Sequence, residues 1–268
     1  MHLSKRLQAV ADMVPKKSRA ADIGCDHAYV SLYLVQNHIA EKVIAMDVNK
    51  GPLQKAKENV EKYGCSDVID LRLSDGAEKL EPGEADVLLI AGMGGGLVQK
   101  ILSERMEVVK ECKALILQPQ SEIANVRKYV TGIGFQIVEE KILIDEGKFN
   151  MMFLAEKEEI KAEKIEKENV EIKEKEDKKI EKKNTEIKET ESIKTKRTEL
   201  SETEYRYGRL LLERKDSCLH EFLNKEKKKY EQILAQLEQS DRDKNKVQYE
   251  KMKQEYEYCK EGLKYYEM

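Results

Sequence analysis

Short apolar segments alternate with amphipathic segments through the first 157 residues, and this alternation constrains the fold more than any other feature of the chain. Strands separated by helices predict right-handed βαβ units and therefore a parallel sheet covered by helices on both faces. Two further apolar segments, 135–143 and 149–155, predict an antiparallel pair that closes the sheet. The expected elements are strands at 19–23, 42–46, 68–73, 86–91 and 114–117, and helices at 3–14, 28–38, 52–63, 96–110 and 121–132.

The composition changes after residue 157 and divides the chain into three regions. Residues 158–200 are mostly Lys and Glu, which fits either a disordered linker or a solvated helix stabilised by i,i+4 ion pairs. In residues 201–268 apolar side chains return at helical spacing, which predicts an antiparallel helical hairpin with a coiled-coil seam. We therefore expect an α/β domain over 1–157, a charged connector over 158–200 and a helical hairpin over 201–268. The clearest seam positions are Tyr249, Met252, Tyr256, Cys259, Leu263 and Tyr266.

Charge and cysteine content limit the classes of function. The formal net charge is -3, so no excess of positive charge indicates nucleic-acid binding, although a local cluster can still hold a few phosphates. The five cysteines form no CxxC pair and no zinc motif, which favours reduced thiols in the cytoplasm and no bound metal. Neither a signal-peptide core nor an apolar run of about 18 residues is present, so we expect no membrane segment.

The end of the first expected strand has the features of a cofactor-binding turn. Asp22 is followed by Gly24, and a helix begins shortly after. The second and third glycines of a G-x-G-x-x-G dinucleotide motif are replaced by Asp26 and Tyr29. A carboxylate at Asp26 would repel a pyrophosphate but suits a cationic ligand, such as the amino group or sulfonium of S-adenosylmethionine (SAM). The turn therefore favours SAM over NAD.

Two further carboxylates follow the next two expected strands. Asp47 ends the second strand, where an acidic residue can accept hydrogen bonds from both ribose hydroxyls of a nucleoside cofactor. The alternative is that Asp47 only caps the helix that starts near Pro52. Asp75 follows the third strand and can accept from the exocyclic amine of an adenine, while Gly76 lets the ring approach. The alternative there is a simple Asp-Gly turn.

Glycines and amides follow the last two parallel strands. The fourth strand leads into four glycines within residues 92–96, which would form a floor where a planar base can approach the methyl donor. The alternative is a flexible loop. After the fifth strand, Gln118 and Gln120 carry amides that can hydrogen-bond a base edge.

Several of these segments together resemble the bacterial tRNA (adenine-22-N1)-methyltransferase family. They are DIGCDHAYV at 22–30, DVNKGPL at 47–53, RLSDG at 72–76, IAGMGG at 90–95 and LILQP at 115–119, with LSKRL at 3–7 and DEGKF at 145–149. The segment at 207–211 resembles the start of the family's helical region, except that Arg209 stands where Pro is expected, and the Lys/Glu run before it is an insertion.

The resemblance implies a Rossmann-like class I methyltransferase domain followed by a C-terminal coiled coil, with SAM as cofactor and tRNA as partner. It implies transfer of a methyl group to N1 of adenosine 22. Carried over by motif, the cofactor and target pocket comprises Asp22, Gly24, Asp26, His27, Asp47, Asp75, Gly76, Gly92 and Met93.

The chemistry of adenine N1 suggests which residues act in catalysis. N1 has an in-plane lone pair, so alignment matters more than deprotonation, and the product is cationic. Asp26 is the first candidate to stabilise that charge and His27 the second; the alternatives are that Asp26 only binds cofactor and His27 only satisfies the turn. Lys5, Arg6 and the Gln118 amide are the expected RNA contacts, with solvated surface charge as the alternative for Lys5 and Arg6.

Other functions remain open from the sequence alone. A SAM-dependent methyltransferase can act on another RNA or on a protein, and the same fold can serve as a non-catalytic RNA-binding module. The series Asp22, Asp47 and Asp75 argues against a module that has lost its cofactor. An NAD-dependent oxidoreductase is disfavoured by Asp26.

Overall fold

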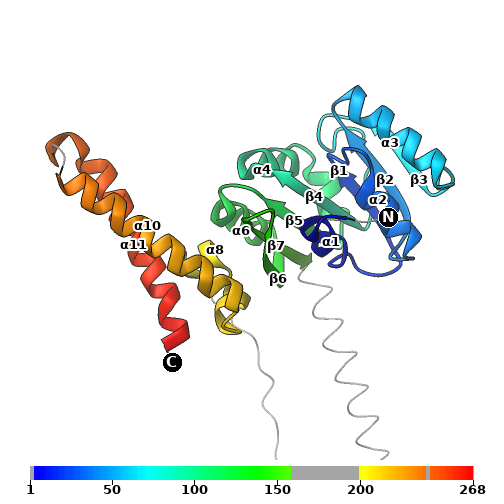
Figure 1. Cartoon of the computed structure of the whole chain (residues 1–268). Helices are drawn as coiled ribbons and strands as arrows, with labels where there is room; N and C mark the ends of the chain where they lie inside the picture. Colours follow the sequence, from blue (N-terminus) through cyan, green and yellow to red (C-terminus); the bar gives the residue numbers. More distant parts are fainter. Residues whose placement is uncertain (1–2, 158–198, 240–241, 268) are drawn as a thin grey trace, which may run out of the picture.

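A seven-stranded sheet forms the centre of the N-terminal domain in this computed structural model, which describes residues 3–157, 199–239 and 242–267 (Figure 1). The strand order is β3-β2-β1-β4-β5-β7-β6, with β7 antiparallel to both of its neighbours and the other neighbouring strands parallel. The predicted parallel sheet with a closing antiparallel pair is therefore confirmed. The strands are β1 Ser18–Ile23, β2 Ala40–Asp47, β3 Ile69–Leu73, β4 Val87–Met93, β5 Ala114–Pro119, β6 Phe135–Asp145 and β7 Lys148–Lys157.

Helices cover both faces of the sheet, as the alternating pattern predicts. One hydrophobic core joins α1, α2 and α3 to one face, and a second core joins α4, α5 and α6 to the other. Alternate strand residues enter the two cores: Ala20 and Val43 face the first, whereas Ala21 and Ile44 face the second. The helices are α1 Lys5–Ala11, α2 Tyr29–Gln36, α3 Lys50–Lys62, α4 Gly95–Glu104, α5 Met106–Glu111 and α6 Ile123–Gly132.

The single helix predicted over 96–110 is wrong, because the chain breaks at Arg105 into α4 and α5. Arg105 has φ -125° and ψ 47°, outside the helical region. Its guanidinium donates to the carbonyl oxygens of Ala77 at 3.4 Å and Leu80 at 2.8 Å, and also to that of Glu78. Tertiary hydrogen bonds to a neighbouring loop thus override a continuous helical pattern.

The C-terminal region contains the predicted antiparallel pair of helices, α10 Ser217–Gln239 and α11 Arg242–Glu267. Hydrogen bonds join opposite ends of the pair: Tyr249 Oη to Glu238 at 2.8 Å, and Tyr266 Oη to the Asp216 carbonyl at 2.9 Å. Two short helices, α8 Glu202–Tyr207 and α9 Arg209–Glu213, precede it. The coiled-coil seam and the domain boundaries stay predictions. The connector prediction falls on 158–200, of which 158–198 lie outside the described residues.

A buried ion pair holds the short C-terminal helices against the sheet. Arg127 on α6 and Glu140 on β6 are 0% and 1% exposed, and the Arg127 Nε to Glu140 Oε1 distance is 2.8 Å. Arg127 Nη1 also donates to the carbonyl oxygens of Tyr205 and Arg206, at the end of α8. The second Glu140 oxygen accepts from the Leu210 backbone N–H at 2.9 Å. One pair of charges therefore satisfies backbone groups at the junction of α8 and α9.

Gly208 makes this docking possible. It lies between α8 and α9 with φ +89°, in the region that favours glycine, and a Cβ there would lie 2.5 Å from Glu140 Oε1. Apolar packing adds to the contact, since Leu211 and Leu212 of α9 share a core cluster with Ile142 of β6 and Met151 of β7.

In the part of the chain that is described, no helix is both long and apolar enough to cross a membrane.

We predict that Gly208→Ala destabilises the protein more than Gly134→Ala does. Gly134 has a similar φ of +97°, but a Cβ added there would meet nothing within 4 Å, so its substitution costs only backbone strain, about 1 kcal/mol. Gly208→Ala also forces Glu140 away from Arg127, which should add about 1–3 kcal/mol. Urea denaturation of both variants measures the difference. Equal losses of unfolding free energy would show that Glu140 moves aside without cost.

Candidate active site

A cavity of about 360 Å³ lies at the carboxyl ends of β1, β2 and β4 and beside the loop after β3. Ligands of open α/β sheets bind at this edge. Every residue predicted to bind cofactor, apart from His27, lines this cavity, so the structure brings together groups from four separate parts of the sequence. The lining includes Asp22, Gly24, Asp26, Asp47, Asp75, Gly76, Gly92 and Met93.

The turn after β1 depends on Gly24. Its N–H and that of Cys25 donate to the Met46 carbonyl at 2.8 and 2.9 Å, which holds the turn against the end of β2. Gly24 has φ +75°, and a Cβ there would lie 2.3 Å from the Met93 Cε. The backbone can approach Met93 only because this residue has no side chain. The turn therefore lets the backbone lie close to the cavity, at the place where the sequence predicts the cofactor.

Asp47 connects the ends of the first two strands. One carboxylate oxygen accepts from the Asp26 N–H at 3.1 Å, and the other accepts from the Asn49 N–H at 2.8 Å. Asp26 has φ +52°, so this hydrogen bond fixes a left-handed residue within the turn. The N-cap of α3 is Asn49, so Asp47 is not the helix cap of the alternative interpretation. Asp47 instead orders both loops and presents its carboxylate to the cavity.

Asp22 is a desolvated carboxylate at the base of the cavity. It is 3% exposed and accepts from the Ser31 Oγ at 2.6 Å. The pKa of Asp22 is raised to about 6, chiefly by burial; the hydrogen bonds from Ser31 oppose this rise, and the negative charge of Asp47 adds a smaller one. Such a group is most favourably ionised when a cation binds beside it. The buried carboxylate of Asp22 therefore favours binding of a positively charged ligand.

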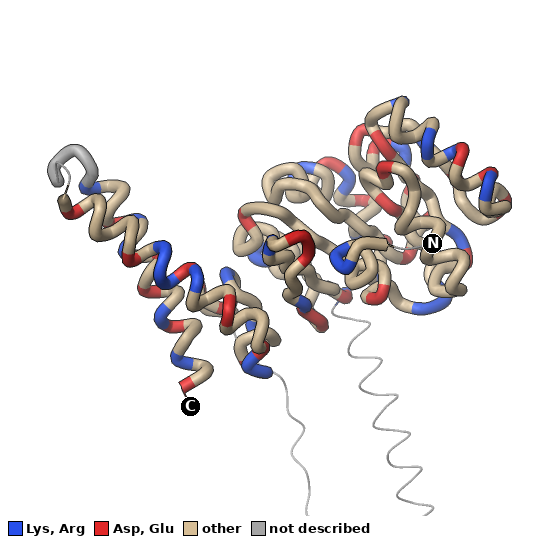
Figure 2. The backbone as a smooth tube through the Cα atoms, in the orientation of Figure 1, with Lys and Arg blue, Asp and Glu red and all other residues tan. Residues whose placement is uncertain are grey.

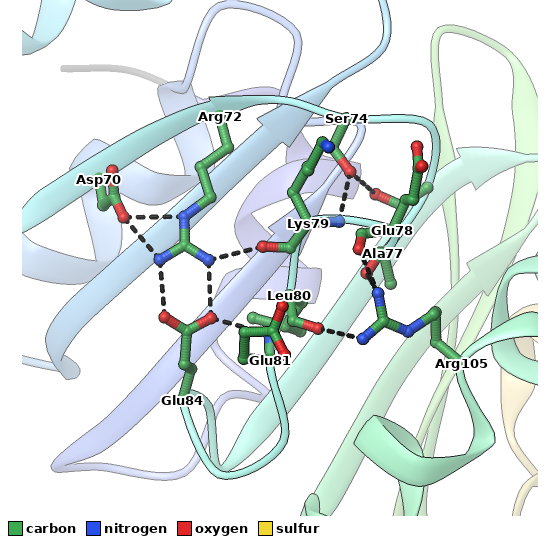
Figure 3. A network of polar contacts seen from close by, with 11 residues as sticks. Asp70, Arg72, Ser74, Ala77, Glu78, Lys79, Leu80, Glu81, Glu84 and Arg105 are labelled. Carbon is green, nitrogen blue, oxygen red and sulfur yellow. Dashed lines mark hydrogen bonds and ion pairs between the residues drawn. The ribbon is translucent and has the colours of Figure 1, made fainter.

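Two arginines hold the loop that carries Asp75 and Gly76 (Figure 3). Arg72 donates to the Lys79 carbonyl at 2.7 Å and pairs with both oxygens of Glu84 at 2.6 and 2.8 Å. Arg105 binds the other side of the same loop through the carbonyls of residues 77, 78 and 80. Asp75 is exposed at the cavity, and a Cβ at Gly76 would lie 2.8 Å from Ile101. The loop thus presents a carboxylate from a fixed backbone.

The glycine loop after β4 is packed against the residues that precede α6. Gly95 and Gly96 begin α4, and their N–H groups donate to Ser121 Oγ at 3.2 Å and Glu122 Oε2 at 3.0 Å. A Cβ at Gly95 would lie 2.4 Å from the Ser121 carbonyl oxygen. The flexible-loop alternative is therefore wrong, and so is the idea of a floor made of all four glycines. Gly92, with φ +80°, is the glycine that faces the cavity.

Gln118, predicted to hydrogen-bond an RNA base, is instead buried. It is 1% exposed, and its side-chain oxygen accepts from the Gly92 N–H at 3.0 Å and from Arg6 Nη1 at 2.8 Å. A buried amide whose oxygen is already engaged twice shapes the loop instead of meeting a base. The prediction failed because Gln118 belongs to β5, which extends two residues beyond the apolar segment at 114–117.

The other predicted site residues lie at different depths. Asp26 is exposed at the cavity. His27 lies outside the lining, with Nε2 3.5 Å from Asp26 Oδ1, and its carbonyl accepts from Asn59. Lys5 is exposed, whereas Arg6 lines the cavity.

The sequence reasoning missed an apolar part of the site. Tyr29, Val48 and Leu97 line the cavity and are 40%, 59% and 44% exposed. Exposed apolar side chains beside carboxylates suit a ligand with a planar ring and polar edges. The available signal was Val48, an apolar residue directly after the acidic strand end. No cluster of three or more potential metal ligands occurs among the residues that the structure describes.

Known proteins share this architecture. Residues 3–153 match the family described as a methyltransferase domain. The tRNA (adenine(22)-N(1))-methyltransferase of Bacillus subtilis is 40% identical over 156 residues, which are 58% of this chain and 66% of that protein. The crystal structure of the B. subtilis M1A22 tRNA methyltransferase superposes with a TM-score of 0.76 at 30% identity, covering 98% of this chain and 99% of that one. The chain belongs to the tRNA (adenine-22-N1)-methyltransferase family.

A further family structure was solved with a ligand. It is a Streptococcus pneumoniae protein assigned as a tRNA (m1A22) methyltransferase, in complex with S-adenosyl-L-methionine. The TM-score is 0.75 at 28% identity, with 98% of this chain and 100% of that chain covered. The sequence match to the curated B. subtilis relative spans just under two thirds of its length, whereas the structural matches include the C-terminal helices.

The raised pKa of Asp22 predicts a pH-dependent effect of Asp22→Asn on stability. A carboxyl whose pKa rises on folding stabilises the protein at low pH and loses that contribution as the pH rises through about 6. The neutral Asn avoids this loss. The gain in unfolding free energy from Asp22→Asn should therefore be about 1 kcal/mol larger at pH 7.5 than at pH 5. Denaturation of the ligand-free proteins at both pH values tests this, and a pH-independent difference would contradict it.

Proposed function

We propose that this protein transfers the methyl group of SAM to N1 of adenosine 22 in tRNA. The observation that carries the proposal is the set of four carboxylates, Asp22, Asp26, Asp47 and Asp75, around one cavity at the carboxyl edge of a methyltransferase fold. Family membership supplies the substrate. The B. subtilis relative is a tRNA (adenine(22)-N(1))-methyltransferase, and the S. pneumoniae protein assigned to the same activity was solved with SAM.

The residues present fit SAM better than a dinucleotide. Because Gly24 has no Cβ, the backbone of its turn can lie close to Met93. The cavity is lined by carboxylates, which would repel the phosphates of a dinucleotide. Asp22 and Asp26 would face the cationic amino acid end, Asp47 the ribose and Asp75 the adenine amine. When bound, SAM supplies an electrophilic methyl group.

The protein's task in catalysis is to hold the target base and stabilise the charge that it gains. Gly92 and Met93 form the part of the cavity wall next to the Gly24 turn, where a planar base would lie. The Asp26 side chain is 70% exposed there, so its carboxylate is free to accept a hydrogen bond from N6 of the base. A negative charge at this position stabilises the developing 1-methyladeninium ion. Because N1 lies on the pairing edge, a paired adenine must first leave its partner.

RNA binding would combine contacts near the cavity with contacts on the C-terminal helices. Lys5 is exposed on α1, beside the cavity residue Arg6, and can bind a phosphate. Residues of both charge signs are interspersed along α10 and α11 (Figure 2). A helical pair docked firmly on the catalytic domain can still hold a large folded RNA through a few well-placed contacts.

Nucleoside analysis of defined transcripts tests the proposal. Full-length protein is incubated with SAM and two tRNA transcripts that differ only in carrying adenosine or guanosine at position 22. We expect 1-methyladenosine in the first transcript alone, since only adenosine presents an N1 lone pair at that position. Equal methylation of both transcripts would place the target elsewhere, and no methylation of either would refute the tRNA assignment.

Asp26 and His27 can be separated by matched substitutions. Asp26→Asn keeps a residue that tolerates the left-handed conformation but removes the negative charge. It should lower kcat about 100-fold and weaken SAM binding by a smaller factor, since Asp26 also faces the cationic end of the cofactor. His27→Gln, which changes the neighbouring polar residue outside the cavity lining, should lower kcat by about tenfold or less. Single-turnover rates and SAM binding are measured for both. A larger loss for His27→Gln would transfer the catalytic role to the imidazole.

A further inference from the structure

Glu122 has a strained backbone beside the glycine loop at residues 92–96. It occupies the N-cap position of α6 with φ +50° and ψ 35°, in the left-handed region that residues with a Cβ rarely adopt. Such strain persists only where surrounding contacts hold it, and it is common at functional sites. The side chain is exposed, so burial does not account for the conformation. The contacts of its carboxylate therefore indicate what the strain maintains.

The carboxylate of Glu122 caps the first turn of α4. Its Oε2 accepts from the Gly96 N–H at 3.0 Å. The Oγ of the preceding residue, Ser121, accepts from the Gly95 N–H at 3.2 Å. Gly95 and Gly96 begin α4, where N–H groups have no acceptor within the helix and a negative charge is favourable. The start of α6 therefore holds the start of α4.

The segments before the two helices are also in direct backbone contact. The Gln120 N–H, two residues before Glu122, donates to the Met93 carbonyl at 2.8 Å. A Cβ at Gly95 would lie 2.4 Å from the Ser121 carbonyl oxygen and 2.9 Å from the Glu122 Cβ. Because no side chain separates the segments, a change in the conformation of Glu122 moves the glycine loop.

The glycine loop carries the part of the cavity wall next to the turn after β1. Met93 lines the cavity, and its Cε lies 2.3 Å from the position that a Cβ would take at Gly24. The body of α4 is fixed independently, because Val98 and Leu102 are 0% exposed in the second core. Loss of the Glu122 contact would therefore loosen the first turn of α4 and the loop before it, while the rest of the helix stays in place.

We infer that Glu122 is a positioning residue for methyl transfer, because it holds the start of α4 and with it the cavity wall at Met93. The inference rests on the proposed function, which places the target base against this wall. Methyl transfer depends on alignment, and a displacement of about 1 Å can lower a rate roughly 100-fold. The carboxylates of Asp22, Asp47 and Asp75 come from β1, β2 and the loop after β3. Cofactor affinity should therefore depend on Glu122 much less than the rate does.

Two substitutions separate the hydrogen bond from the backbone strain. Glu122→Gly removes the carboxylate but relieves the left-handed strain, so its melting temperature should stay close to that of the wild type. Glu122→Gln removes the charge but keeps an acceptor oxygen at the same reach. The matched control is Glu104→Gln, which removes one negative charge from an exposed side chain at the other end of α4.

Three measurements on the full-length proteins test the inference. They are single-turnover methyl transfer from SAM to a saturating tRNA transcript, calorimetric binding of S-adenosylhomocysteine, and amide hydrogen exchange. For Glu122→Gly we expect a rate about 10- to 100-fold lower and exchange of the Gly96 amide about tenfold faster, with S-adenosylhomocysteine affinity within about twofold of the wild type. Glu122→Gln should recover most of the rate, since its oxygen can still accept from Gly96. Glu104→Gln should match the wild type.

Other patterns would overturn the inference. A purely structural role lowers the melting temperature and weakens S-adenosylhomocysteine binding together with the rate. A Glu122→Gln protein as slow as Glu122→Gly would show that the hydrogen bond is not what holds the loop. If the wild type transfers no methyl group to tRNA, the proposed function fails and the inference fails with it. An active wild type with an equally active Glu122→Gly protein would refute the inference alone.

Discussion

The buried ion pair between Arg127 and Glu140 is the polar interaction on which the contact between the sheet domain and the C-terminal helices depends. Both side chains are almost completely removed from water, so losing either partner would leave an unpaired buried charge, at a cost of about 3–5 kcal/mol. The pair connects α6 and β6 of the sheet domain with the backbone between α8 and α9. Since α6 starts just after Ser121 and Glu122, which hold the glycine loop, one helix contacts both the catalytic edge and the C-terminal helices.

The binding cavity is organised around charges that the protein leaves unbalanced. Asp22 is buried beside the neutral hydroxyl of Ser31, which leaves its pKa raised, and Arg6 is held by the neutral amide of Gln118. Backbone groups fix the positions instead: Asp47 accepts two N–H groups, and Gln118 joins Arg6 to Gly92. A cation bound beside Asp22 would offset part of the cost of burying its charge.

The sequence predicted the parts of this structure that depend on local pattern. Strand and helix positions follow from apolar periodicity, and the end-of-strand carboxylates meet because parallel strands end at one edge. It failed where a side chain forms a tertiary hydrogen bond. Arg105 breaks a helix whose pattern is continuous, and Gln118, predicted to contact a base, is buried. No local signal distinguishes Arg6 in the cavity from Lys5 on the surface, because the difference lies in a contact with residue 118.

The charge distribution explains how such a protein could bind an RNA without a basic surface. The net charge is -3 and the C-terminal helices carry interspersed charges of both signs (Figure 2), so long-range attraction to a polyanion is weak. Recognition must then depend on short-range geometry, which requires that the helical pair and the cavity keep a fixed separation. The junction at Gly208, where Glu140 accepts from the Leu210 N–H, supplies that constraint. A protein that binds RNA through few phosphate contacts gains affinity when its binding surfaces are already held in position. Binding then costs less conformational entropy, because fewer groups must be ordered on the RNA.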